Sequence, residues 1–200
     1  MGDKVALEIK EKILRDVNVL HKFIILLVNA NDEPINGRFK LQKIMYVLSD
    51  SVDEIKEQCS YEATNYGPYS KILDEEVRYL KQIGVLTEDV GKITLTGMGK
   101  KIAHELYKNE DEETRYRLNK HKDFLNDMTK NELLTYIYSA QPDMIKESIE
   151  YDNLKPHMEK HVMSLLKKHK ISAQRAGELL KIPQYTIIKK MNAMNMITLR

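Results

Sequence analysis

The stretch Tyr61–Thr96, YEATNYGPYSKILDEEVRYLKQIGVLTEDVGKITLT, decides the fold. Its residue order predicts an extended segment over 61–66, a tight turn at Gly67-Pro68, a helix over 70–83 and a hairpin over 85–95. A helix followed directly by a small hairpin is the second half of a winged helix. The sequence on either side of this stretch therefore has to supply the other helices of such a domain.

Two residues set the limits of the central helix. Ser70 is a favourable N-cap, and Gly84 stands where a helix should end. Between them, apolar residues recur at helical spacing: Ile72, Leu73, Val77, Leu80 and Ile83. We expect the turn before this helix to be fixed, with Tyr66 and Tyr69 packed around it.

Further helices are predicted around this stretch. Apolar spacing indicates a modest amphipathic helix over 3–16, a buried helix over 17–30, a third helix over 38–50 and a fourth over 98–107. The predicted fold class is therefore mainly α with a small β component. Residues 1–108 are expected to form a winged-helix domain with one hairpin wing.

Two segments carry a family resemblance. KLQKIMYVLSD (40–50), followed by YEATNYGPYSKILDEEVRYLKQIGVL (61–86), resembles the YwgA-like proteins of bacteria and archaea. Those proteins have a Lys-Leu-Gln-Lys helix and then a Tyr-Gly-Pro-Tyr/Phe-Ser segment that opens the next helix. Residues 128–149 are similar to their tail, and the Panacea (SocA-like) antitoxin group is a more distant match. The resemblance covers about residues 17–150, and it implies a winged-helix fold with no established catalysis.

The charges of the 200-residue chain are divided unevenly. The net charge is only +2, but residues 155–200 carry ten Lys/Arg and two acids, which gives +8. The preceding 154 residues carry 22 bases and 28 acids, which gives −6. If the protein meets nucleic acid, the basic C-terminal quarter is the predicted contact.

The helix over 70–83 is a poor candidate for reading DNA, although the second helix of such a motif usually enters the major groove. Its predicted outward face includes Asp74 and Glu75, with Glu76 nearby, and the turn of the hairpin carries Glu88-Asp89. These acids would repel phosphates. The winged helix is therefore expected to be either a protein-interaction surface or a scaffold that only packs.

Residues 109–155 are predicted to form a helical extension and linker. A helix is expected over 113–125, and Thr129 with Glu132 is a capping box that opens another helix. The segment 151–156 is polar and ends in a proline, which is typical of a linker.

Residues 156–200 are predicted to form a basic helix-turn-helix unit. Ser172 is an N-cap, Gly177 is the small residue where two helices cross closely, and Pro183 suits the first turn of a second helix. Lys181 stands in the turn where Gly is commonest, so it must accept a left-handed or strained conformation. The segment resembles the short helix-turn-helix of small prokaryotic antitoxins.

In such a motif the N-terminal residues of the second helix reach the base edges. The predicted base readers are Gln184, Tyr185 and Thr186, while Lys189 and Lys190 are expected to neutralise phosphates. The full set of predicted contacts with double-stranded DNA is Ser172, Gln174, Arg175, Gln184, Tyr185, Thr186, Lys189 and Lys190. The alternative for this unit is a helical hairpin that only dimerises or packs.

The residues give little support to an enzyme. His157 and His161 have metal-ligand spacing, but no third ligand is obvious, and Met158 stands where the general-base Glu of a metalloprotease motif would follow. Cys59 has no nearby His or basic motif that would activate it as a nucleophile. We expect no catalysis, no cofactor and no metal.

The sequence predicts a DNA-binding transcription regulator or antitoxin-like protein of a prokaryotic cytosol. No apolar run reaches the roughly 18 residues of a membrane span, the N-terminus lacks a signal-peptide pattern, and a single cysteine suits a reducing compartment. A homodimer is expected, with the N-terminal helix and Met191, Met194 and Met196 as pairing surfaces. The alternative is a protein-interaction adaptor that uses the winged helix and binds no DNA.

Overall fold

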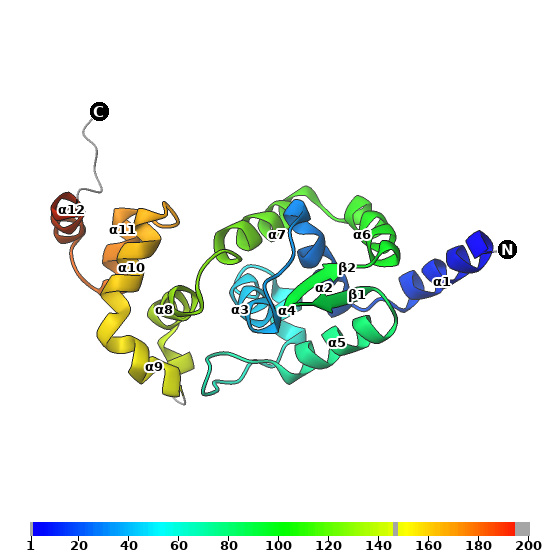
Figure 1. The fold of residues 1–200 in the computed structure, drawn as a ribbon, viewed down its shortest axis with the longest axis horizontal. Helices are drawn as coiled ribbons and strands as arrows, with labels where there is room; N and C mark the ends of the chain where they lie inside the picture. Colours follow the sequence, from blue (N-terminus) through cyan, green and yellow to red (C-terminus); the bar gives the residue numbers. More distant parts are fainter. Residues whose placement is uncertain (1, 146–147, 195–200) are drawn as a thin grey trace. The chain divides into compact units, whose positions relative to one another are not determined.

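The computed structural model describes residues 2–145 and 148–194. It divides into two compact units: Met1–Glu62 with Pro68–Asn126 (unit 1), and Ala63–Gly67 with Asp127–Arg200 (unit 2). Both units are mainly helical, as Figure 1 shows. The division into a winged-helix domain (1–108), a helical extension (109–155) and a basic helix-turn-helix unit (156–200) stays a prediction.

The elements of unit 1 include every helix predicted there, together with the hairpin. In chain order they are α1 (Gly2–Asp16), α2 (Val19–Asn29), η1 (Ala30–Asp32), α3 (Arg38–Leu48), α4 (Asp53–Gln58), α5 (Lys71–Gln82), β1 (Leu86–Asp89), β2 (Lys92–Leu95), α6 (Gly97–Asn109) and α7 (Glu112–Leu125). Helix α4 is an addition, because a six-residue helix is too short to show a clear apolar period.

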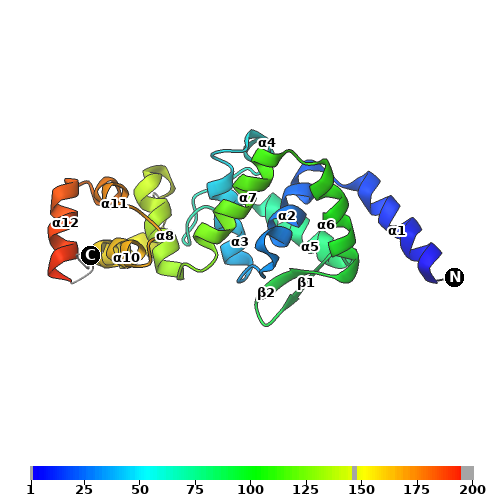
Figure 2. The ribbon, with the colours of Figure 1, turned by 90° about the horizontal axis from the view of Figure 1, so that it is seen from above.

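The buried helix α2 is the centre of unit 1. Its side chains Phe23, Ile24, Ile25 and Leu27 are at most 1% exposed. Helices α4, α5, α6 and α7 and strand β2 all contact α2, and Figure 2 shows it enclosed among its neighbours. Burying one such side chain contributes roughly 1.5–3 kcal/mol. The most apolar run of the sequence therefore forms the core of this unit.

The hairpin β1–β2 is the only sheet among the described residues, and its strands are antiparallel. Leu86 pairs with Leu95 at its open end, and the two-residue turn at its tip has positive φ at both positions. Such a turn matches the right-handed twist of paired strands. Ile35 adds an isolated bridge to Ile93, which ties the loop before α3 to the hairpin.

Two polar side chains of α3 hold the Gly-Pro turn and the start of α5. Lys43 Nζ donates to the Pro68 carbonyl at 2.7 Å. Gln42 Nε2 donates to the Ser70 carbonyl at 2.8 Å, and Gln42 Oε1 accepts from the Ser70 N–H at 3.0 Å. Ser70 caps α5 as predicted, since its Oγ accepts from the Leu73 N–H at 3.1 Å. The Lys-Leu-Gln-Lys sequence thus has a structural role in positioning α5.

The predicted strand over 61–66 is wrong. Glu62 and Tyr69 form an isolated bridge with two N–H···O bonds of 2.9 Å, and the residues between them find no partner strand. A turn is formed, but earlier than predicted: the Gly67 N–H donates to the Thr64 carbonyl at 3.0 Å, so the turn spans 64–67 and Pro68 follows it. Gly67 has φ 82°. Tyr66 does not pack around this turn as expected, because it is 58% exposed.

The acids of α5 form less of an open acidic face than the sequence indicates. Asp74 is only 8% exposed, and it shares the guanidinium of Arg38 with Glu88 of the hairpin, each at 3.1 Å. Glu76 Oε2 lies 2.5 Å from His21 Nε2. The expectation that Asp74 points outward is therefore wrong, because its carboxylate is held between basic side chains.

Unit 2 consists of short helices packed around a small apolar core. Its elements are α8 (Lys130–Ala140), η2 (Pro142–Ile145), α9 (Ile149–Leu154), η3 (Lys155–His157), α10 (Met158–Lys167), α11 (Ala173–Leu180) and α12 (Gln184–Ala193). Helix α10 packs on α8 and α11, and α11 packs on α12 (Figure 2). Val162, Leu165 and Ile187 are fully buried in this core. The two helices predicted on either side of the turn at 181–183 are confirmed as α11 and α12.

The segment expected to be a linker, 151–156, is helical. It is covered by α9 and η3, and Leu154 is 3% exposed. Pro156 is accommodated because it lies in the first turn of η3. Ser148 caps α9 and also donates from its Oγ to the Asn65 carbonyl at 3.2 Å, which explains why residues 63–67 belong to unit 2.

Of the helices in the described ranges, none combines the length and the apolar composition that crossing a bilayer requires.

Candidate nucleic-acid interface

The predicted DNA contacts lie on two short helices joined by a three-residue turn. The turn between α11 and α12 consists of Lys181, Ile182 and Pro183. Lys181 has φ 56° and ψ 39°, which is the left-handed conformation that its position requires. A Cβ atom at Gly177 would lie 2.7 Å from the Ile182 carbonyl oxygen. Glycine therefore allows the turn to come close to α11, and both expectations are confirmed.

The predicted contacts on α11 are engaged within their own helix. Ser172 Oγ accepts from the Arg175 N–H at 3.0 Å, so Ser172 is the N-cap of α11. Gln174 Nε2 and Arg175 Nη1 donate to the two carboxylate oxygens of Glu178 at 3.2 and 2.9 Å. The Arg175 guanidinium also lies 5.8 Å from the ring centroid of Tyr136. These residues support α11 first, and any contact with DNA would compete with Glu178.

The start of α12 is more open. Gln184 and Tyr185 are exposed, the latter by 62%, and Thr186 is half-buried. Pro183 is the N-cap of α12 and makes no side-chain cap, so the first turn has no side chain folded over it. Lys189 Nζ lies 5.6 Å from the Tyr185 ring centroid, on the same side of the helix. The structure therefore brings Tyr185 and Lys189 together on one exposed face of α12, and Gln184 is exposed at the start of the same helix.

Lys190 is not part of that open surface. Its Nζ lies 2.7 Å from Glu159 Oε1, so it bridges α12 to α10. This pair cannot be predicted from local sequence, because its two residues are 31 positions apart. The expected phosphate contact at Lys190 would have to replace an existing ion pair.

The positive charge of unit 2 is partly neutralised by such pairs. Lys168 binds Glu132 at 2.7 Å, and Lys170 binds Asp127 at 3.0 Å. Within the described part of the unit, no ion pair involves Lys155, Lys160, Lys167, Lys181 or Lys189. The net count of +8 therefore overstates the cations that are ready to bind phosphate.

Metal binding and a reactive cysteine are the two enzyme features that the sequence raises. In the ranges that the structure describes, no group of three His, Cys, Asp or Glu side chains is arranged to hold a metal ion. Burial raises the pKa of the Cys59 thiol to about 11, which disfavours the reactive thiolate. The strongest candidate site is therefore the exposed start of α12.

Comparison with known proteins adds no relative. No protein-family profile matches the chain, and no curated protein is similar to it. The resemblance to the YwgA-like and Panacea groups therefore stays a prediction from the residues.

Proposed function

We propose that the protein binds double-stranded DNA through α11 and α12, as a transcription regulator or antitoxin-like protein of a prokaryotic cytosol. The observation that supports this most is the packing of the two helices. Gly177 and the left-handed Lys181 hold α12 close to α11, and the first turn of α12 stays exposed. Helix-turn-helix proteins present the start of their second helix to the major groove.

The proposed roles follow from the side-chain chemistry. Gln184 can bind an adenine through two hydrogen bonds, and Tyr185 and Thr186 can contact neighbouring base edges or the backbone. Lys189 and Lys181 would neutralise phosphates without reading sequence. Contacts from Ser172, Gln174, Arg175 and Lys190 would be secondary, because their polar groups already have partners.

We further propose that α3, α5 and the hairpin form a winged helix that does not read DNA. Its order of helices and hairpin and the attachment of α5 to α3 through Gln42 support this description. The competing function is an adaptor that uses the winged helix to bind a protein and makes no DNA contact. The ion pairs that tie Asp74 and Glu88 to Arg38 favour this alternative, because they make the α5–hairpin surface rigid.

A salt titration separates the two functions. The full chain is mixed with a fluorescent 20-base-pair duplex of random sequence, and anisotropy gives the affinity between about 50 and 200 mM salt. DNA binding releases counterions, so the affinity should fall with a slope of about −0.9 for each phosphate contact. An adaptor would show no binding above background at any salt concentration.

Two variants test whether Gln184 recognises the DNA sequence. Gln184→Ala should change the preferred sequence by about 1–3 kcal/mol at one base pair. Gln174→Ala should leave the preference unchanged, because Gln174 already donates to Glu178. Selection from a random duplex pool measures both. Equal preferences for the two variants and the wild type would contradict the role of Gln184.

A further inference from the structure

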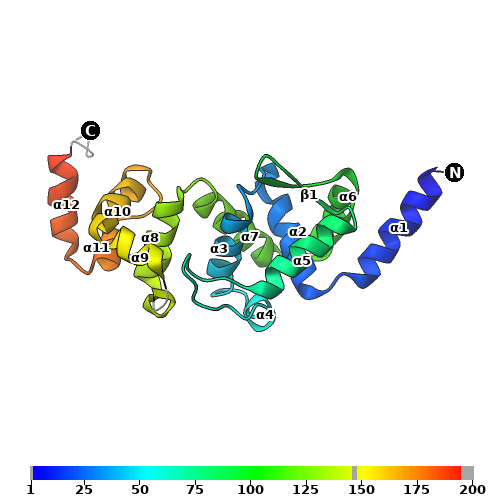
Figure 3. The ribbon, with the colours of Figure 1, turned by 60° about the horizontal axis from the view of Figure 1, so that its bottom comes forward.

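Helix α1 has an apolar stripe that unit 1 leaves about half exposed. Val5 and Ile9 are 53% and 47% exposed, and they lie one turn apart on the same face. The neighbouring face, about 100° around the helix from Ile9, packs on α6, where Lys10 Nζ lies 3.5 Å from Glu105 Oε1. Figure 3 shows α1 standing out from the rest of unit 1. The two exposed side chains therefore need another partner to leave water.

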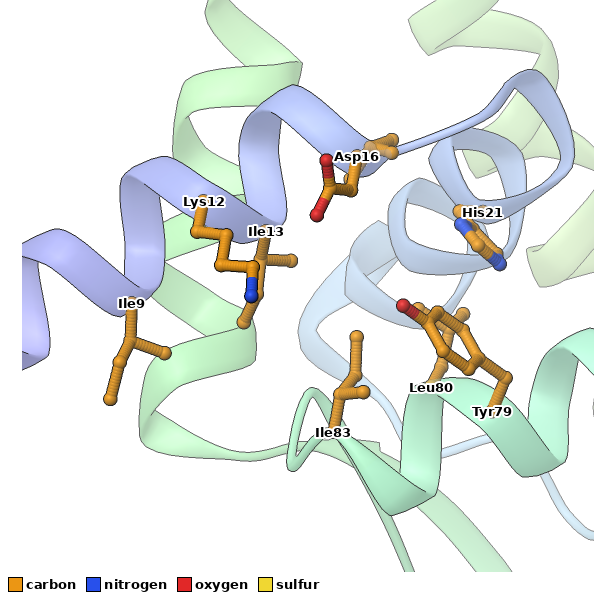
Figure 4. A pocket seen from close by; sticks show the side chains of 9 residues that line it. Ile9, Lys12, Ile13, Asp16, His21, Tyr79, Leu80 and Ile83 are labelled. Atoms are coloured by element: carbon orange, nitrogen blue, oxygen red, sulfur yellow. The ribbon is translucent and has the colours of Figure 1, made fainter.

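The same face of α1 continues into a cavity of about 290 Å³. Ile9 and Ile13 line it from α1, Tyr79 lines it from α5, and Ile83 lines it from the position that follows α5. Figure 4 shows these side chains around an open space, with Lys12 and Asp16 on the same side of α1. The stripe thus has uncovered apolar side chains at its N-terminal end and an unfilled apolar cavity at its C-terminal end.

The α5 side of this cavity is held firmly. The rings of His21 and Tyr79 are stacked with centroids 5.1 Å apart and an interplanar angle of 16°. The two ring nitrogens of His21 are engaged by Glu76 and by the Asn18 N–H. Tyr79 is nevertheless 41% exposed. A preformed surface of this kind loses little conformational freedom when a partner covers it.

We propose that α1 of a second copy of this chain lies antiparallel in the groove between α1 and α5. If the two helices cross at Ile9, Val5 of the second copy lies level with Ile13 and over the cavity. The same contact is repeated on the other side of the two-fold axis, as an isologous interface requires. Each copy therefore supplies the apolar side chain that the cavity of the other copy lacks.

The charges beside the stripe support a reversed copy of the same helix. Glu8 and Lys12 lie one turn apart on one edge of the stripe, and no ion pair in the described structure uses either of them. In an antiparallel pair, Glu8 of each copy comes within reach of Lys12 of the other. A parallel pair would instead place like charges level with each other. The crossing also brings the two Glu8 side chains near each other, but the two Glu8–Lys12 pairs outnumber this single like-charge contact, so the helix has a net charge complementarity to its own reverse.

This interface uses residues of unit 1 alone, so it can fail without affecting the proposed DNA contact. A four-turn helix in a groove covers less than the roughly 800 Å² per partner of a standard interface. The dimer is therefore expected to be weak, with a dissociation constant on the order of 10 μM.

Light scattering on the full chain tests whether the apolar stripe of α1 forms a dimer. The wild type should move from monomer to dimer between about 1 and 200 μM. Ile9→Asp should raise the dissociation constant at least tenfold. Leu7→Asp is the matched control, because Leu7 is also on α1 and 51% exposed but lies about 160° around the helix from Ile9. A wild type that is monomeric throughout, or equal effects of the two variants, would overturn the proposal.

Charge exchange and crosslinking test the orientation. Glu8→Lys and Lys12→Glu should each weaken the dimer, and the double variant should restore it. Ile9→Cys should form a disulfide between copies under oxidation, whereas Leu7→Cys should not, because only Ile9 lies at the crossing point. Native Cys59 is buried and does not interfere. Failure of the double variant to restore pairing, or crosslinking at Leu7, would contradict the antiparallel arrangement.

Discussion

At the scale of single residues, buried lysines organise the loops of unit 1. Lys122 is fully buried, and its Nζ donates to the carbonyls of Val28, Ala30 and Glu33 at 2.8, 2.6 and 2.5 Å. Burial lowers the pKa of Lys122 to about 8, although nearby carboxylates partly offset this. The ammonium group therefore satisfies carbonyls at the C-terminal end of α2, where a helix leaves them without partners.

Removing this ammonium should destabilise unit 1. We expect Lys122→Met to lower the free energy of unfolding by about 2–4 kcal/mol, because a buried carbonyl left without a donor costs about 1–3 kcal/mol. Urea unfolding measures the loss. Lys120→Met on the same helix is the control, since Lys120 is exposed and should change stability by less than about 0.5 kcal/mol. Similar losses for the two variants would contradict the role of Lys122.

A second residue, Glu132, links α8 to α10. Burial alone would raise its pKa, but hydrogen bonds from Lys168 Nζ (2.7 Å), Ser164 Oγ (2.7 Å) and the Thr129 N–H (2.8 Å) lower it to about 2. The pKa in the folded state is thus below the ordinary value of 4.5. The stabilisation by Glu132 is therefore complete above pH 4.5 and is lost as the pH falls towards 2.

Acid unfolding measures this contribution. The wild type should lose about 2–4 kcal/mol through Glu132 between pH 4.5 and 2, because one pKa unit corresponds to about 1.4 kcal/mol. Glu132→Gln should be less stable at pH 7 and should show a flatter profile over that range. Glu159→Gln, at an exposed position, should keep the profile of the wild type. Parallel profiles for all three proteins would show that Glu132 has no such role.

At the scale of helices and strands, contacts between residues close in sequence could be predicted, whereas contacts between residues far apart in sequence could not. The N-caps Ser70, Thr129 and Ser172 lie within three residues of the N–H groups that they accept, so sequence alone located the helix starts. The partners of Lys190 and Lys122 lie 31 to 94 positions away. The strand predicted over 61–66 is wrong because alternating residue types do not show whether a partner strand exists.

The crossing of α11 and α12 gives a prediction at this scale. Gly177→Ala should destabilise unit 2 by about 1–3 kcal/mol, because its Cβ would lie 2.7 Å from a backbone oxygen that cannot move aside cheaply. Gly97→Ala on α6 is the control, since its Cβ would meet nothing within 4 Å. Urea unfolding compares the two. A larger loss at Gly97 would contradict the close packing of the turn on α11.

At the scale of the whole molecule, charge is divided between the two ends of the sequence. Composition predicted the basic C-terminal quarter, and the structure shows that several of its cations are engaged by Glu132, Asp127, Glu178 and Glu159. Composition alone could not distinguish engaged cations from available ones, because that depends on the packing of α8, α10 and α12. Lys189 stays exposed beside Tyr185, and it is therefore the most informative single cation.

In the proposed function, α12 and not α5 contacts DNA. The most direct measurement is the salt dependence of DNA binding by the full chain carrying Lys189→Ala or Lys71→Ala. Both lysines are exposed on the second helix of a candidate motif, which makes them a matched pair. Lys189→Ala should reduce the slope of log K against log salt by about 0.9, the loss of one phosphate contact, and Lys71→Ala should leave the slope unchanged. A reduced slope for Lys71→Ala with an unchanged slope for Lys189→Ala would contradict the claim.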